Sequence, residues 1–336
     1  MTVSVFGGPR SVEDMMNAAR KVLNPRLASR SADKSRSLEV LKTGRMLNVI
    51  GYKSGGFAVI ATDDKFAPVL GYSDTQFATD DMPPAMMWWM DMAEHALQTA
   101  LDGGYEITPA AELRSGKYPE AVGELLTTRW DQSMPYNKEL LRITGKNYPT
   151  GCMATAMAQI MKYHSYPVTG QGYKGYAIDG KNGNYDFENT TYRYDRMLDV
   201  YSANNYTAEQ ADAVAKLMLH CGVAVDMNYG LSGSGSFSSD ATTALNEYFK
   251  YDSRLYSRDI YTKAEWMDII FDEISNGRPI LYGGVTAQNA GHAFVFDGYD
   301  AEGLVHVNWG WSGSGNGYFE VALLNSNTGS YSYGQD

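Results

Sequence analysis

The chain has 336 residues, of which 44% are hydrophobic and 12% aromatic, so it is long enough for two domains with packed cores. Its net charge of −11 and pI near 5.0 argue against a nucleic-acid-binding protein, because nothing suggests a phosphate-neutralising surface. No run approaches the roughly 18 apolar residues of a membrane span, and residues 1–10 lack the charged and apolar regions of a signal peptide.

The first hundred residues are predicted to form a small α+β unit. Ser11 is the expected N-cap of a helix over residues 11–23. Strands are expected over residues 46–52, 56–61 and 69–72, and a second helix over 86–101, which closes at Gly103-Gly104. Residues of about 105–120 contain Pro and Gly and have little hydrophobic periodicity, so we expect an exposed linker of the kind that proteases cut.

The remainder is predicted to place helices before a twisted antiparallel sheet, which is also an α+β arrangement. Helices are expected over residues 153–164, 208–221, from 239 or 240 onward, and over 263–276. Strands are expected over 279–285, 292–299, 304–309 and 318–323, and residues 170–185 are expected to be irregular or hairpin-like.

Cys152 stands where a loop turns into a helix, and it is one of only two cysteines, too few for a disulfide framework. Pro149 and Gly151 mark the turn. Apolar residues then recur at positions 153, 156, 157, 160 and 161, as in an amphipathic helix. Unpaired backbone N–H groups and the dipole at a helix N-terminus favour an anion and lower a thiol pKa. Cys152 is therefore a candidate nucleophile.

A cysteine nucleophile needs a general base, and His292 is the strongest candidate among five histidines. It follows a small Asn-Ala-Gly loop and opens an apolar strand, so it can project into a cleft. It lies 140 residues after Cys152 (292 − 152), within the roughly 130–150 found in papain-like enzymes. On its own this separation is a weak signal.

The other histidines have simpler interpretations. His95 is expected on the surface of its helix, and His164 is more than three turns from Cys152 and is expected to cap the helix C-terminus. His220, next to Cys221, is expected to be a packed helix end. His306 lies in a strand and could face either side.

Three further residues are candidates for supporting roles. Asn308 and Trp309 follow the predicted His292 strand, where an amide or carbonyl could orient the imidazole and an indole could exclude water. An aromatic hairpin in the core would explain the same residues. Gln132 precedes the cysteine in a polar loop, and its amide could donate to an oxyanion beside the Cys152 N–H. The order Gln, Cys, His, Asn is that of papain-like peptidases.

Several longer segments resemble the streptopain family of bacterial cysteine peptidases. The resemblance covers the cysteine helix, the histidine strand, the Asn-Trp motif and a segment before the Ser/Gly loop: residues 150–167, 291–299, 306–311 and 225–230. In the first unit, residues 55–60 and 69–73 resemble the inhibitory propeptide of that family. Family members continue with a further strand where this sequence stops, so we expect the end of the sheet to be affected.

The resemblance implies a two-subdomain papain-like fold for residues 118–336, preceded by an inhibitory prodomain over 1–117. It makes Cys152 the nucleophile, His292 the general base and acid, and Gln132 the oxyanion donor. Asn308 and Trp309 would support His292, and which of them orients it stays open. Stretches 231–239 and 284–291 would border the cleft, and maturation would cut the linker near Lys117.

The same resemblance implies protein or peptide substrates, a prodomain that acts as an intramolecular inhibitor, and a secreted or cell-surface location. No cofactor, nucleic acid or membrane span is expected, and no metal, because no cluster of His, Cys, Asp and Glu has ligand spacing. The sequence is also compatible with two alternatives. The Cys–His pair could serve another acyl transfer or amidase reaction, or the chain could be a non-enzymatic adhesin-like module.

Overall fold

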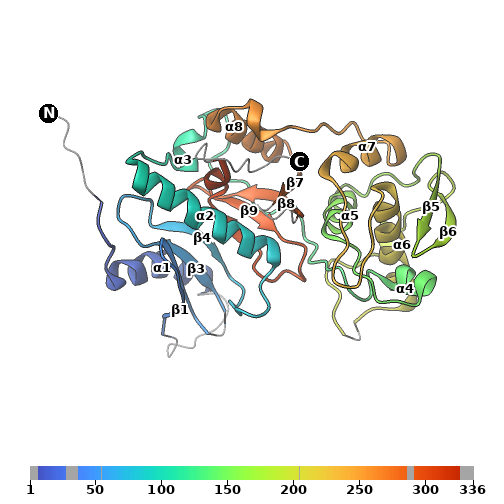
Figure 1. Cartoon of the computed structure of the whole chain (residues 1–336), viewed down its shortest axis with the longest axis horizontal. Helices are drawn as coiled ribbons and strands as arrows, with labels where there is room; N and C mark the ends of the chain where they lie inside the picture. The colour runs from blue at the N-terminus through green and yellow to red at the C-terminus, as the bar shows by residue number, and fades with distance from the viewer. Residues whose placement is uncertain (1–6, 28–36, 54, 204, 286–290, 326–336) are drawn as a thin grey trace.

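The computed structural model describes residues 7–27, 37–53, 55–203, 205–285 and 291–325 (Figure 1). Most of the stretch 284–291 expected at the cleft lies outside these residues, as does the end of the chain after residue 325. None of the helices in the described ranges is long and apolar enough to cross a membrane.

The N-terminal unit, residues 7–104, contains the predicted helices and strands and one strand more. Its elements are α1 (Val12–Leu27), β1 (Glu39–Thr43), β2 (Leu47–Gly51), β3 (Phe57–Ala61), β4 (Val69–Ser73) and α2 (Pro84–Gly103). The Ser11 hydroxyl accepts a hydrogen bond from the Asp14 N–H at 3.1 Å, which confirms the predicted N-cap. Gly104 ends α2 in the left-handed conformation at φ 68°, which also matches the prediction. Strand β1 was not predicted from its mixed polar sequence.

The C-terminal unit, residues 118–325, places its helices before most of its strands. The helices are α4 (Lys138–Thr144), α5 (Cys152–His164), α6 (Ala208–Ala224), α7 (Ser238–Tyr248) and α8 (Lys263–Ser275). The strands are the hairpin β5 (Tyr173–Ile178) and β6 (Lys181–Asp186), then β7 (Ile280–Val285), β8 (Gly291–Tyr299), β9 (Val305–Asn308) and β10 (Gly317–Phe319). The short helix α4 was not predicted.

The last strand is shorter than its predicted range of 318–323. Residues Val321–Asn325 form a 3-10 helix, η3, instead. Glu320 turns the chain at this point, because its side chain accepts the N–H of Ala322 at 3.1 Å and its carbonyl accepts the N–H of Leu323 at 3.4 Å. Local side-chain acceptors of this kind compete with a strand ladder.

A single antiparallel sheet runs through both units, in the order β1-β2-β3-β4-β10-β9-β8-β7. The joint is the pairing of β4 with β10, where Gly71, Tyr72 and Ser73 lie opposite Phe319, Tyr318 and Gly317. In Figure 1 the N-terminal strands lie on the left of this sheet and helices α4 to α7 lie to its right. The N-terminal unit is therefore an extension of the C-terminal sheet rather than a separate body.

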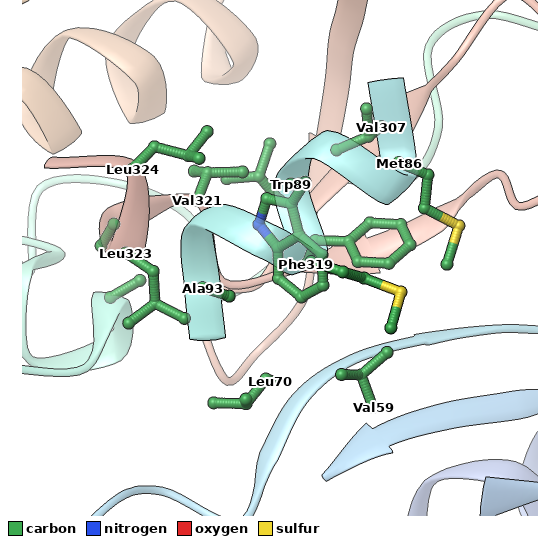
Figure 2. Packing of buried hydrophobic residues seen from close by; sticks show 14 of the residues in the cluster. Val59, Leu70, Met86, Trp89, Ala93, Val307, Phe319, Val321, Leu323 and Leu324 are labelled. Carbon is green, nitrogen blue, oxygen red and sulfur yellow. The ribbon is translucent and has the colours of Figure 1, made fainter. Parts of the chain in front are cut away.

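The two units also share a hydrophobic core. Trp89 of α2 is fully buried and packs edge-on against Phe319, with ring centroids 4.9 Å apart. Figure 2 shows residues of α2 and the N-terminal strands beside residues of β9, β10 and η3. Burial of apolar surface between the two units stabilises the joint, by about 25 cal/mol for each Å² buried.

The predicted linker is only partly free. The short helix α3 (Ala110–Leu113) interrupts it, and the N–H of Ala110 donates to the buried Glu320 carboxyl at 3.0 Å. The hydroxyl of Tyr118 donates to Asp268 on α8 at 2.8 Å. Residues 115–117 between these two ties are exposed. Residues 105, 106, 108, 119 and 120 are exposed as well, so the linker is accessible at several points, of which the segment around Lys117 is one.

Candidate active site

Cys152 is the first residue of α5. Its N-cap, Gly151, has φ 89°, a conformation that residues with a side chain rarely adopt. A Cβ at this position would lie 2.6 Å from the sulfur of Met227, so the close packing also requires glycine. The carbonyl of Pro149 accepts the hydroxyl of Ser234 at 2.7 Å. The Ser/Gly loop predicted to border the cleft therefore lies beside the start of α5.

The thiol of Cys152 does not have the acidity expected from its place in the helix. Burial raises its pKa, although hydrogen bonds from backbone N–H groups of Ala293, Met153 and Cys152 itself act in the opposite direction. The predicted low pKa is therefore wrong for this state of the protein. The reason is that desolvation disfavours the thiolate more than the helix N-terminus favours it.

The contact with Ala293 places the sulfur of Cys152 beside β8, one residue from His292. Alternate residues of β8 face opposite sides of the sheet. Ala293 packs in the cluster that contains the α5 helix, whereas Phe294 packs with α2. The ring of His292 lies on the same side of the sheet as that of Phe294. Both rings lie against Trp88 of α2, with ring centroids 6.1 Å from Trp88 for His292 and 6.2 Å for Phe294.

The His292 imidazole thus lies on the α2 side of the sheet, while Cys152 approaches from the other. Burial lowers the pKa of His292 and favours its neutral form. Gly284 of β7 pairs with His292 and leaves room for the indole of Trp88, because a Cβ on residue 284 would lie 2.5 Å from that indole. The N-terminal unit therefore packs against His292 through Trp88.

Gln132 lies next to the start of α5. Its carbonyl accepts the N–H of Thr150 at 3.0 Å, two residues before Cys152. Its own N–H donates to the side chain of Asp131, which also accepts the hydroxyl of Ser312 at 2.6 Å. The backbone of residues 128–132, which we call the Gln132 loop, is thereby fixed against both the start of α5 and the loop after β9. The role predicted for its side-chain amide, donation to an oxyanion at Cys152, stays a prediction.

Asn308 is buried and does not contact His292 in this structure. Its Nδ2 donates to the Thr128 carbonyl at 2.8 Å, and its Oδ1 accepts from Gln159 of α5 at 3.2 Å and from the N–H of Gly310 at 3.1 Å. Its amide is therefore committed to holding the end of β9 against the segment before Gln132.

Trp309 is buried as well. Its Nε1 donates to the Gly315 carbonyl at 3.0 Å, and its ring packs against Phe294 and Phe319, with centroids 4.8 and 5.3 Å apart. Phe294 is two residues along β8 from His292, so Trp309 supports the strand rather than the imidazole itself.

The remaining histidines lie away from this site. His95 is exposed, as predicted. His164 ends α5, but Ser165, in the left-handed conformation, is the C-cap, so the capping role expected for His164 is wrong. Its ring lies against Tyr163 and Tyr251 instead. His220 is buried, with Nδ1 2.9 Å from the Tyr192 hydroxyl, as expected of a packed helix end.

His306 forms a buried ion pair with Asp297 of β8, with Nδ1 2.6 Å from Oδ1. The other oxygen of Asp297 accepts the N–H of Leu126, and Nε2 of His306 lies 3.5 Å from Glu124. Burial opposes the charged imidazolium, but Asp297, Glu124 and the more distant Asp74 outweigh it, so the pKa of His306 is raised.

This pair predicts a pH-dependent stability. Because the folded pKa of His306 exceeds the value of about 6.5 in an unfolded chain, its stabilisation is complete below pH about 6.5 and is lost as the pH rises through the folded pKa. The melting temperature of an inactive Cys152→Ala chain should fall over that range. His306→Gln in the same background should remove this part of the dependence of the melting temperature on pH. If that dependence were unchanged, the His306–Asp297 pair would not be its cause.

A cavity of about 710 Å³ lies at the far end of α5 and is not lined by Cys152. Its walls include His164, Leu245 and Trp266. None of the candidate catalytic residues is among the walls of this cavity. Among the described residues, no group of three or more His, Cys, Asp and Glu could hold a metal ion.

Two residues with contacts to the candidate site are missing from the prediction. Trp88 belongs to the most apolar run of the sequence, and that run indicates only that the helix is buried. Gln159 is a polar residue on the apolar side of a helix, seven positions after Cys152, and it is fully buried. A buried polar residue in such a position is a signal that the sequence contains.

The chain is similar to known thiol proteases and to a protease inhibitor. The model of the Peptidase C10 family matches residues 130–319, and that of the Spi protease inhibitor matches residues 12–97. The thiol protease/hemagglutinin PrtT of Porphyromonas gingivalis is 33% identical over 287 residues, which are 80% of this chain but 33% of that protein. Streptopain of Streptococcus pyogenes is 31% identical over 308 residues, covering 84% of this chain and 75% of streptopain.

Solved structures of Prevotella intermedia proteins are similar as well. A prointerpain A fragment matches with 41% identity and a TM-score of 0.79, covering 87% of this chain and 94% of that one. Active interpain A matches with 45% identity and a TM-score of 0.57, covering 61% and 88%. The predicted α+β, papain-like fold with an N-terminal prodomain region is thereby confirmed. With a family match over more than half its length and streptopain similar over most of it, the chain belongs to the Peptidase C10 family of cysteine peptidases.

Proposed function

We propose that this chain is the latent form of a secreted bacterial cysteine endopeptidase. Residues 118–336 would be the catalytic domain, and residues 1–117 the prodomain that keeps it inactive. The observation that carries the proposal is the place of Cys152, which starts α5 with its sulfur at the backbone of Ala293, next to His292. Family membership and the inhibitor match in the N-terminal unit support it.

The reaction follows from the chemistry of these groups. His292 takes the proton of Cys152, and the thiolate attacks the carbonyl carbon of the scissile peptide bond. The side-chain amide of Gln132 and the N–H of Cys152 donate to the resulting oxyanion. His292 then protonates the leaving amine, which leaves a thioester on Cys152. Water, deprotonated by His292, hydrolyses the thioester and restores the thiol.

Latency follows from the contacts of the prodomain. Trp88 lies against His292 on the α2 side of the sheet, so the imidazole has to turn to the other side before it can accept the Cys152 proton. Removal of the prodomain takes Trp88 away and frees Gly284 and His292. Cutting within the exposed residues 115–117, near Lys117, would achieve this.

A thiol-directed epoxide inhibitor tests the proposal. The processed protein should take up one equivalent, on Cys152, and lose its hydrolysis of casein in proportion. Cys221 is the internal control, because it is fully buried beside Met161 and burial raises its pKa far above the usual range. A Cys221→Ala chain should label identically. Labelling without inhibition, or a processed protein that does not cleave casein, would refute the proposed function.

A further inference from the structure

Gln159 is the one residue of α5 whose side chain bonds to the Gln132 loop, among the contacts that the described residues make. It lies seven residues after Cys152 and is fully buried. Its Oε1 accepts the hydroxyl of Thr128 at 3.0 Å and the N–H of Trp130 at 3.3 Å. Its Nε2 donates to Oδ1 of Asn308 at 3.2 Å. Burying an amide costs free energy unless its donors and acceptors are hydrogen-bonded, and those of Gln159 are.

Backbone groups fix the direction of both amides in this contact. The N–H of Trp130 can only donate, so Oε1 of Gln159 must face it and Nε2 must face Asn308. In the same way, the N–H of Gly310 requires an oxygen from Asn308, whose Nδ2 then meets the Thr128 carbonyl. Only a side chain with one acceptor and one donor at its end satisfies this arrangement.

These bonds close a ring that contains both proposed oxyanion donors. From Cys152 the ring follows α5 to Gln159, crosses to Trp130, and continues along the chain to Gln132. The carbonyl of Gln132 then accepts the N–H of Thr150, which returns to Cys152. The separation between the Gln132 amide and the Cys152 N–H is therefore set by two links, and one of them is the Gln159 side chain.

We propose that Gln159 is a positioning residue that fixes the spacing of the oxyanion donors, Gln132 and the Cys152 N–H. The inference rests on the proposed peptidase function. A second tie, from Ser312 to Trp130 and Asp131, lies at the more exposed side of the loop. Loss of Gln159 should therefore shift the donors without releasing the loop.

The test uses Gln159→Met, which keeps the volume and removes the amide. The full chain is processed by immobilised wild-type enzyme, and active sites are titrated with an epoxide inhibitor. Per titrated site, kcat for peptide hydrolysis should fall about 10- to 100-fold, as expected for a misplaced oxyanion donor, while KM changes little. Alkylation of Cys152 by iodoacetamide forms no oxyanion, so its rate and pH profile should stay within about 3-fold of wild type.

Two further variants guard against a folding defect. Thr128→Val removes one of the two donors to Gln159 and should lower kcat less, in the same pattern. Tyr192→Phe removes a buried hydrogen bond to His220 and should leave kcat per site unchanged. An unchanged kcat in Gln159→Met, or an equal fall in alkylation, would overturn the inference. If wild-type protein failed to cleave peptides while labelling normally, the proposed function would fail instead.

Discussion

The His292→Ala chain is expected to hydrolyse peptides about 10²–10⁴-fold more slowly than the wild type, as for other enzymes that lose a general acid–base residue. The reason is that, in the proposed mechanism, His292 acts twice, first to take the Cys152 proton and then to protonate the leaving amine. The defect should therefore appear in kcat more than in KM, measured on protein processed in trans by immobilised wild-type enzyme.

The other histidines provide the control for this prediction. His164 lies at the opposite end of α5, against Tyr163 and Tyr251, so His164→Ala should retain kcat near that of the wild type. A Cys152→Ala chain gives the background rate of peptide hydrolysis in the assay. If His292→Ala kept more than about a tenth of wild-type activity, well above the range expected for loss of a general base, another group would have to be the base.

Much of the fold could be predicted because the positions of most helices and strands follow from local sequence patterns. The helix that starts at Cys152 follows from Gly151 and the apolar spacing after it, and α2 ends at the Gly104 turn as expected. The pairing of β4 with β10 could not be predicted in this way. Gly71 and Phe319 are 248 residues apart (319 − 71), and short strands carry little information about distant partners.

The roles predicted for Cys152, Gln132 and His292 stay predictions, but the motif order does anticipate which segments lie together. The Gln132 carbonyl bonds to Thr150, two residues before Cys152, and Cys152 lies beside Ala293 of β8. The face of the sheet that His292 occupies is fixed by the register of β8, and the residue that covers it there, Trp88, belongs to a distant part of the chain that local patterns do not connect to β8. The raised pKa of Cys152 likewise depends on burial that no local pattern encodes.

Trp88→Ala is expected to activate the intact chain. Trp88 is largely buried against His292 and Gly284, and truncation of a buried Trp costs about 3–5 kcal/mol, which would raise the undocked fraction about 10²–10⁴-fold. Iodoacetamide should then alkylate Cys152 faster in the uncut chain, and the linker should be cut sooner. After processing, the mature enzyme would be identical to wild type, so any difference belongs to the latent state.

Two matched variants separate the contact with His292 from docking in general. Trp89→Ala, one residue along α2, removes the packing on Phe319 and leaves Trp88 against His292. It should loosen the joint to a similar extent, so a faster alkylation in Trp88→Ala than in Trp89→Ala would measure the effect of the contact with His292. Trp88→Phe keeps a ring against the imidazole and should stay latent. Equal activation by both alanine variants would mean that the prodomain blocks the enzyme by docking alone, and that the position of His292 is a consequence of latency rather than its cause.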